Sequence, residues 1–216
     1  MTAEIRCFES APFAQNSYVL WLPGRSDAVV VDPGFEPGLI LDLLKGEGLS
    51  LAAILNTHGH VDHIAGNRAV KQAFPTAPIV IGVGDAAMLT DADLNLSGPF
   101  GLPITSPSAD RVVKESDSLS FAGMDFDVLD IPGHSPGHVV YLVRGTTPLQ
   151  VLGGDVLFRE GIGRYDFPGG SFRRLAEGIR AKLFSLPPDS VVYPGHGPVT
   201  TIGYEKANNP FVGVNA

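Results

Sequence analysis

The chain has 216 residues, of which 44% are hydrophobic and 18% charged, and its formal net charge is -8. This length suits one compact domain, and the composition is that of an ordinary globular protein without a low-complexity segment. The negative charge and the lack of a Lys/Arg cluster argue against nucleic acid as a partner. We therefore expect a single domain over residues 1–216.

The N-terminal residues mix charged side chains with isolated apolar ones, so they lack the basic region and apolar run of a secretory signal. No apolar run is long enough to span a membrane. Cys7 is the only cysteine, which excludes an internal disulfide, and we expect a buried small hydrophobe rather than a nucleophile. We expect a cytoplasmic protein with no membrane partner.

Several short β-rich runs end in a turn signal and predict buried strands, at residues 28–31, 51–55, 126–131, 149–152 and 191–193. The loops that follow them carry Asp32, His58, His134, Asp155 and His196. Loops at strand ends can present polar groups from a rigid sheet without burying unsatisfied backbone. We therefore expect these side chains to share one rim of strand ends.

Helical signals alternate with the strands, at residues 39–44, 62–74, 85–89 and 171–184, and Ser171 is the expected N-cap of the last helix. This alternation favours a layered α/β architecture. Residues 91–109 are rich in Gly, Pro and Ser and predict a long ordered loop. The loop is either a surface excursion or a flap whose apolar residues contact substrate, namely Leu94, Leu96, Phe100 and Leu102.

The six histidines all lie in three short motifs, formed by His58, His60 and His63, by His134 and His138, and by His196. One residue separates His58 from His60, so an extended backbone points both imidazoles the same way. Asp62 and His63 begin the following helix and can face a second position. One turn can therefore supply ligands to two adjacent ions.

Two ions a few Å apart need a bridging carboxylate, and Asp155 at a strand end is the natural candidate, although a turn Asp is the alternative. His134 would complete the first shell and His196 the second. His138 is expected to support the site rather than bind a metal, and Asp32 to form a turn that could orient it. The predicted ligands, suited to Zn, Fe or Mn, are His58, His60, Asp62, His63, His134, Asp155 and His196.

The stretch Thr57-His58-Gly59-His60-Val61-Asp62-His63 resembles the signature of the metallo-β-lactamase superfamily. Further segments follow in family order, including Asp32-Pro33-Gly34, Gly133-His134-Ser135-Pro136-Gly137-His138, Gly154-Asp155 and Pro194-Gly195-His196. The resemblance implies an α/β fold, the four-layer αββα sandwich, with metals at one edge of two facing sheets.

Within that superfamily, Leu157-Phe158 and residues 161–170 are similar to the short bacterial form of glyoxalase II. This implies a hydroxyacylglutathione hydrolase-like enzyme that holds two divalent metal ions, zinc or otherwise iron or manganese. It would cleave a small-molecule thioester such as S-lactoylglutathione by a metal-bridging hydroxide. Asp62 would be a catalytic residue that acts mainly as a ligand.

Arg164 stands where long glyoxalases place a cation near the glycine carboxylate of the substrate, and the alternative is a solvated or dimer-contact Arg. Asp166 replaces the aromatic hydroxyl that those enzymes use two residues further on. We do not expect this sequence to include the helical domain that binds glutathione in the long enzymes. The resemblance therefore leaves the thiol part of the substrate open.

Other activities fit parts of the pattern. Lactone hydrolases share the ligand set. Mononuclear-iron persulfide dioxygenases have a stretch similar to Gly163-Arg164-Tyr165-Asp166-Phe167, but His138 stands where they tend to have Cys. β-Lactam hydrolysis is not expected, because zinc β-lactamases differ at the position of Asp155. The complete two-metal set favours a hydrolase.

Overall fold

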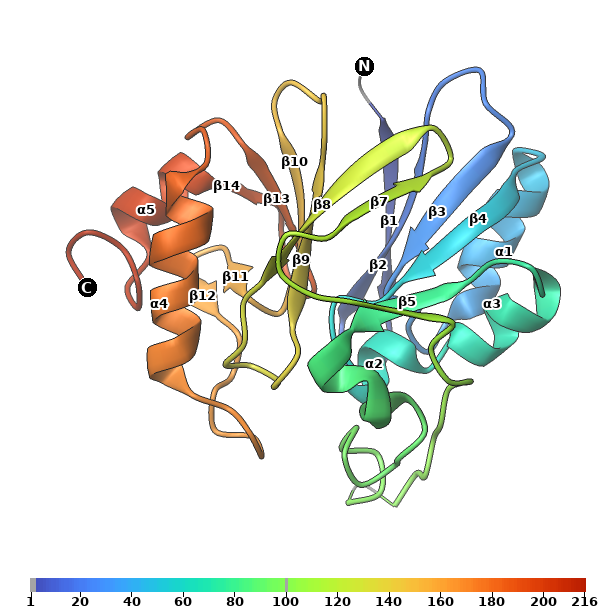
Figure 1. Cartoon of the computed structure of the whole chain (residues 1–216), viewed down its shortest axis with the longest axis horizontal. Coiled ribbons are helices and arrows are strands. Elements are labelled where there is room, and N and C mark those ends of the chain that lie inside the picture. Colours follow the sequence, from blue (N-terminus) through green and yellow to red (C-terminus); the bar gives the residue numbers. More distant parts are fainter. Residues whose placement is uncertain (1–2, 100) are drawn as a thin grey trace.

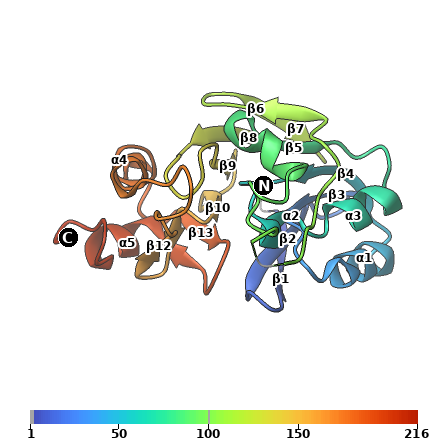
Figure 2. The ribbon, with the colours of Figure 1, turned by 90° about the horizontal axis from the view of Figure 1, so that it is seen from below.

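The structure is a computed structural model that describes residues 3–99 and 101–216, so Phe100 of the predicted loop lies outside the described residues. Two six-stranded sheets lie face to face, and helices cover their outer surfaces (Figures 1 and 2). Over the described ranges, no helix combines the length and apolar character needed to cross a membrane.

The first sheet contains the N-terminal strands in sequence order, β1 to β6. Its first three strands form an antiparallel meander, whereas β3 to β6 run parallel and need crossover connections. The strands are β1 (Glu4–Ser10), β2 (Gln15–Trp21), β3 (Asp27–Val31), β4 (Ser50–Leu55), β5 (Ile79–Gly82) and β6 (Arg111–Val113). The connections contain α1 (Pro37–Gly46), α2 (Val61–Ile64), α3 (Asn67–Ala73) and the 3-10 helix η1 (Val83–Leu89).

The second sheet has the strand order β14-β13-β10-β9-β8-β7, and only β10 and β13 pair in parallel. Its strands are β7 (Ser118–Phe121), β8 (Met124–Asp130), β9 (Val139–Val143), β10 (Gln150–Gly154), β13 (Val191–Pro194) and β14 (Thr200–Thr201). A small hairpin, β11 (Leu157–Phe158) and β12 (Gly161–Ile162), follows β10. The outer layer contains α4 (Phe172–Lys182), the 3-10 helix η2 (Leu183–Ser185) and α5 (Ile202–Asn208).

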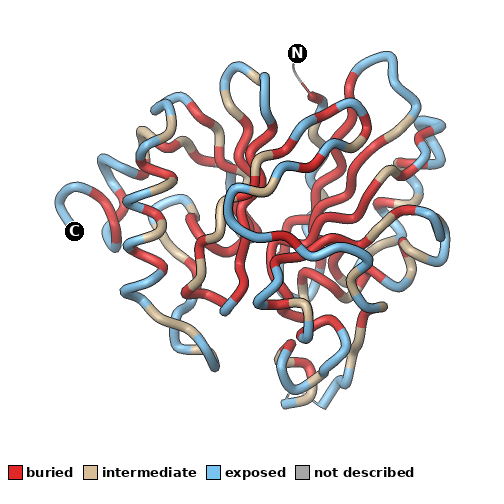
Figure 3. Tube along the Cα trace, in the orientation of Figure 1, coloured by how far each residue is buried: buried red, intermediate tan, exposed pale blue. Residues whose placement is uncertain are grey.

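Alternating side chains bury both faces of each sheet, which explains why the strands read as continuous apolar runs. In β3, Val29 and Val31 face the opposite sheet, while Val30 packs toward Ile40 of α1. Figure 3 shows this buried layer along the central strands. A third cluster packs the second sheet against α4 and α5. The layer order is therefore helix, sheet, sheet, helix, as expected from the sequence.

The predicted strands are all present, and Ser171 accepts a hydrogen bond from the amide of Arg174 as the N-cap of α4. The predicted helix at 62–74 is wrong in one respect, because it divides into α2 and α3 at Ala65 and Gly66. The Gly66 amide donates to the Pro33 carbonyl at 2.8 Å, and a side chain at Gly66 would collide with the 33–34 backbone. This tertiary contact interrupts the helix.

Cys7 corrects a second expectation, since its side chain is exposed rather than buried. It lies on β1, which is the edge strand of the first sheet and has few fully buried positions. The β propensity of this segment did not indicate which side chains would face solvent.

The two sheets approach closely beside the predicted metal loops. A Cβ atom at Gly82, the last residue of β5, would strike the carbonyl oxygen of Gly137 and the side chain of Val139. Gly137 belongs to the loop that carries His134. The two backbones can therefore meet only because position 82 has no side chain.

We predict that Gly82→Ala lowers the free energy of unfolding by about 1–3 kcal/mol, the usual cost of overpacking a close contact. Urea unfolding followed by circular dichroism would measure it. Gly38→Ala is the control, since Gly38 lies in α1 with nothing near its would-be Cβ and Ala favours helix by ~0.5–1 kcal/mol. Equal unfolding midpoints for Gly82→Ala and wild type would contradict the prediction.

Candidate metal centre

The predicted ligands meet at one edge of the two sheets, where several strands end. β4 leads into Thr57 and His58, β10 leads into Asp155, and β13 leads into His196. His134 lies in the loop between β8 and β9. The rim of strand ends expected from the sequence is therefore present.

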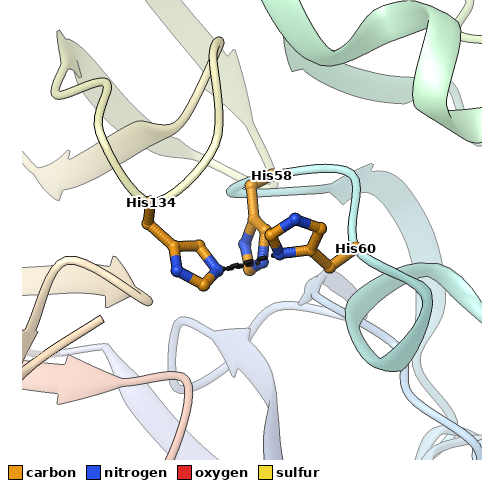
Figure 4. Close-up of side chains that lie close together, drawn as sticks. All are labelled: His58, His60 and His134. Carbon is orange, nitrogen blue, oxygen red and sulfur yellow. Dashed lines mark hydrogen bonds between the residues drawn. The ribbon is translucent and has the colours of Figure 1, made fainter. Parts of the chain in front are cut away.

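The first group of ligands is formed by His58, His60 and His134, whose side chains converge in Figure 4. One ring nitrogen from each lies within 4.8 Å of the others. His134 Nε2 is 2.8 Å from His60 Nδ1 and 3.2 Å from His58 Nε2. All three side chains are buried.

The second group is formed by Asp62, His63 and His196, again with one ligand atom each within 4.8 Å of the others. Asp62 Oδ2 is 3.2 Å from His196 Nε2 and 3.7 Å from His63 Nε2. Asp62 and His63 lie in α2, directly after His60. The turn that runs from His58 to His63 therefore supplies side chains to both groups, as its spacing predicts.

Asp155 lies between the two groups. Its Oδ2 is 3.5 Å from His134 Nε2 in the first group and 3.5 Å from His196 Nε2 in the second. Its Oδ1 is 3.4 Å from His63 Nε2. The structure thus brings all seven predicted residues together, with the carboxylate shared between both groups.

Burial and neighbouring charges set the ionisation of the cluster. Burial, reinforced by the neighbouring imidazoles, lowers the pKa of His60 to about 3 and that of His58 well below its ordinary value. Burial also opposes the charge on His63, but the carboxylates around it, Asp155 foremost, raise its pKa well above the usual range. Asp155 shows the reverse, since its charged neighbours outweigh burial and lower its pKa. The centre therefore favours a positive charge beside its carboxylates.

The donor set fits divalent cations. His63 Nε2 and Asp155 Oδ1 are buried and have no hydrogen-bond partner among residues 3–99 and 101–216, although burying a polar atom unpaired costs free energy. Imidazole and carboxylate together are suitable ligands for zinc, iron or manganese. A cation between the groups would satisfy both atoms.

Backbone and carboxylate acceptors orient the imidazoles from outside. Nδ1 of His63 donates to Asp32 at 3.0 Å, that of His134 to the Arg164 carbonyl at 2.8 Å, and that of His196 to the Phe13 carbonyl at 3.1 Å. Each bond leaves Nε2 free to face the cluster. These partners therefore select the ring orientation that metal binding needs.

Asp32 and His138 lie outside the two groups around Asp155, although Asp32 has a ligand atom within 4.8 Å of ligand atoms of His58 and His63. Asp32 accepts hydrogen bonds from the amide of Thr57 at 2.7 Å and from its hydroxyl at 2.6 Å, besides the bond from His63. His138 Nε2 accepts the backbone amide of Asp155 at 2.9 Å, and its ring stacks on His58. Asp32 therefore orients the metal-binding turn, as the sequence suggested it could.

Asp85 is a supporting residue that sequence reasoning missed. It is fully buried and accepts hydrogen bonds from the Gly59 amide at 3.1 Å, the Ser135 hydroxyl at 2.5 Å and the Gly137 amide at 2.6 Å. It therefore ties the turn of His58 and His60 to the loop of His134. The only feature of the sequence that could have indicated this role is the position of an acidic residue shortly after the apolar strand β5.

A cavity of about 320 Å³ opens beside the cluster. Asn95 and Leu96 of the predicted long loop line it, and the Asn95 carbonyl accepts the amide of Val61 at 3.0 Å. Part of the loop therefore lies against the site, while Leu94 and Leu102 are exposed, and its predicted role as a flap over substrate stays a prediction.

Arg164 also lines this cavity, but its guanidinium is already engaged. Nε and Nη2 donate to the two carboxylate oxygens of Asp166 at 2.9 and 3.0 Å. The guanidinium carbon lies 4.2 Å from the centre of the Phe167 ring. The structure thus places Arg164 at the cavity, paired with a neighbouring acid.

A family model of the metallo-beta-lactamase superfamily matches residues 10–196. The chain belongs to this superfamily, and the resemblance drawn from the His and Asp motifs is confirmed. Family membership and the His/Asp cluster together support a metal-dependent hydrolase that uses divalent metal ions.

The individual proteins that this chain resembles have names that indicate different activities. The chain is 36% identical to the hydroxyacylglutathione hydrolase GloC of Haemophilus influenzae, over 93% of each chain. It superposes with a TM-score of 0.91 and 37% identity on the BLEG-1 B3 metallo-beta-lactamase, covering 97% of this chain and 99% of that one. It superposes with a TM-score of 0.84 and 38% identity on TTHA1623 in a di-iron-bound form, covering 95% and 99%.

We predict that Asp85→Ala lowers the free energy of unfolding by ~3 kcal/mol or more, because two amides and a hydroxyl lose a buried acceptor. Denaturant unfolding would measure the loss, and metal content after dialysis would show weakened binding as the two loops separate. Asp85→Asn should lose less, since it keeps one acceptor oxygen.

Asp42→Ala is the matched control, because Asp42 is exposed on α1 and should change stability by no more than about 0.5 kcal/mol. If Asp85→Ala retained both the stability and the metal content of the wild type, Asp85 would not be the tie between the loops.

Proposed function

We propose that this chain is a two-metal hydrolase that cleaves a small thioester, S-lactoylglutathione or a compound of the same class. The observation that carries the proposal is the position of Asp155, whose carboxylate lies 3.4–3.5 Å from histidines of both groups. Adjacent ions need such a shared carboxylate. The similarity to GloC supports the thioester in particular.

His58, His60 and His134 would hold one ion, and Asp62, His63 and His196 the other. When bound, such ions polarise a substrate carbonyl and activate water at neutral pH. Zinc is the metal we propose, since it suits imidazole and carboxylate ligands. Iron is the principal alternative, because a relative of 38% identity was solved in a di-iron-bound form.

Asp62 acts mainly as a ligand in this proposal. Burial raises the pKa of its carboxyl, but His63 and His196 outweigh that effect and lower the pKa below its ordinary value. Asp62 therefore carries no proton to donate at neutral pH. A thioester does not need one, because a thiolate with a pKa near ~8.5 leaves without strong acid assistance.

The cavity suits a small molecule with apolar parts, and six of its lining side chains are apolar, from Phe13, Val61, Leu96, Phe158, Ile162 and Phe167. Such walls exclude water around the reacting carbonyl. With its net charge of -8, the chain is unsuited to nucleic acid, and we propose no nucleic-acid or membrane partner.

We predict that the purified protein binds about two divalent ions per chain and hydrolyses S-lactoylglutathione in a metal-dependent way. Metal analysis by mass spectrometry and thiol release would be measured, before and after chelation. Lactones and a β-lactam should be tested beside it, since one structural relative is named a B3 metallo-beta-lactamase. A single iron with oxygen uptake on glutathione persulfide, and no thioester cleavage, would reject the proposal.

We predict that Asp155→Asn reduces the bound metal from about two ions to about one, because the amide cannot bridge two cations. Metal stoichiometry after dialysis measures this directly, and thermal unfolding shows whether the variant is folded. Asp42→Asn on the surface of α1 should keep both ions. Two tightly bound ions in Asp155→Asn would refute the bridging role.

A further inference from the structure

Arg164 lines the cavity and pairs with Asp166, which lies outside the cavity lining. Two parallel hydrogen bonds of 2.9 and 3.0 Å join the guanidinium to the carboxylate. Both side chains are about two-thirds exposed, at 65% and 64%. The hydrogen bonds from Arg164 lower the pKa of Asp166, so its carboxylate is charged at neutral pH. The pair is therefore neutral as a unit and accessible to a ligand.

Phe167 separates this pair from the metal centre. The guanidinium of Arg164 lies over the Phe167 ring, and the same ring contacts His60 and His134, with centroid separations of 5.1 and 5.8 Å. The ring holds the cation beside the cavity, since a guanidinium is attracted to an aromatic face. Arg164 thus lies where it can meet the distal part of a substrate whose carbonyl is at the histidines.

Arg164 is the only Lys or Arg among the described residues that line the cavity. The acidic side chains that line it are Asp62 and Asp155, which belong to the metal centre. A substrate carboxylate distant from the reacting carbonyl can therefore find a permanently charged partner only in Arg164. A carboxylate can take the Nε and Nη2 donors only by displacing Asp166, and at the remaining Nη1 edge it meets a guanidinium whose charge Asp166 already offsets.

We propose that Asp166 tunes substrate charge at this site: by pairing with Arg164, it weakens the binding of thioesters with an anionic thiol portion, S-lactoylglutathione among them, relative to uncharged ones. The proposal rests on the proposed thioester hydrolysis and names its preferred substrate class. Asp166 lies two residues from Arg164, so its effective concentration is far higher than that of a free ligand. Removing its charge frees the guanidinium for an anionic substrate.

Binding of two matched probes tests this without relying on turnover. S-butylglutathione carries two carboxylates, and its diethyl ester carries none. Calorimetric titration of the metal-loaded protein gives the Kd of each probe. In Asp166→Asn, the ratio of the diacid Kd to the diester Kd should fall about fivefold, the size of effect expected for a solvent-exposed ion pair.

Three further variants isolate the cause. In the double variant Asp166→Asn/Arg164→Gln, the ratio of the diacid Kd to the diester Kd should return to the wild-type value, because the freed cation is what binds the diacid. Arg164→Gln alone should retain its histidine contact, since that bond uses the backbone carbonyl. Glu177→Gln removes the same charge from an exposed pair with Arg173 on α4 and should leave the ratio unchanged.

The outcomes separate this proposal from the proposed function. An unchanged ratio in Asp166→Asn, an equal shift for both probes, or a gain that persists without Arg164 would overturn the role of Asp166. So would failure of either probe to bind any variant. The expected ratio without cleavage of any thioester would support charge selection and reject only the hydrolysis. With hydrolysis present, kcat/KM for S-lactoylglutathione should rise in Asp166→Asn through a lower KM.

Discussion

The buried carboxylate of Asp85 joins the two halves of the molecule at the point where the histidine cluster forms. It accepts the Gly59 amide from the first half and the Gly137 amide and Ser135 hydroxyl from the second. Two further hydrogen bonds join the same segments, from the Val139 amide to the Thr57 carbonyl at 2.8 Å and from the Tyr141 hydroxyl to the Asn56 carbonyl at 3.0 Å, but among the described residues only Asp85 bonds to both loops that carry the histidines of the first group. Groups of ligands must be held to within fractions of an ångström, so this buried acid is a condition of the site.

Buried charges also pair within the histidine cluster itself. Asp62, Asp155 and Asp32 surround His63, whose pKa they raise well above its ordinary value, while burial lowers the pKa of His58, His60 and His134. A divalent cation would replace such protons, so metal binding and deprotonation are coupled in centres of this kind. The buried unpartnered atoms of His63 and Asp155 are therefore best understood as part of a site for cations.

The residues proposed to select the substrate lie in a different part of the molecule from the candidate metal ligands. The hairpin β11–β12 and the segment around Arg164 and Phe167 form one side of the cavity, and the loop of Asn95 and Leu96 forms another. These segments lie outside both sheets, although the Arg164 carbonyl accepts a hydrogen bond from His134 and the Phe167 ring contacts His60. Loops outside a shared framework are where proteins of one fold commonly differ.

The sequence by itself predicted the alternating strands and helices and the seven candidate ligands, because the apolar runs have strand length and the His and Asp residues follow the strand ends. It could not reveal the break at Gly66, the exposure of Cys7, the role of Asp85 or the pairing of Arg164. The first three depend on contacts between residues distant in the chain: a glycine against a loop, a strand at a sheet edge, an acid between two loops. Arg164 and Asp166 are near in sequence, but only the folded loop over Phe167 decides that the carboxylate, rather than solvent, occupies the guanidinium.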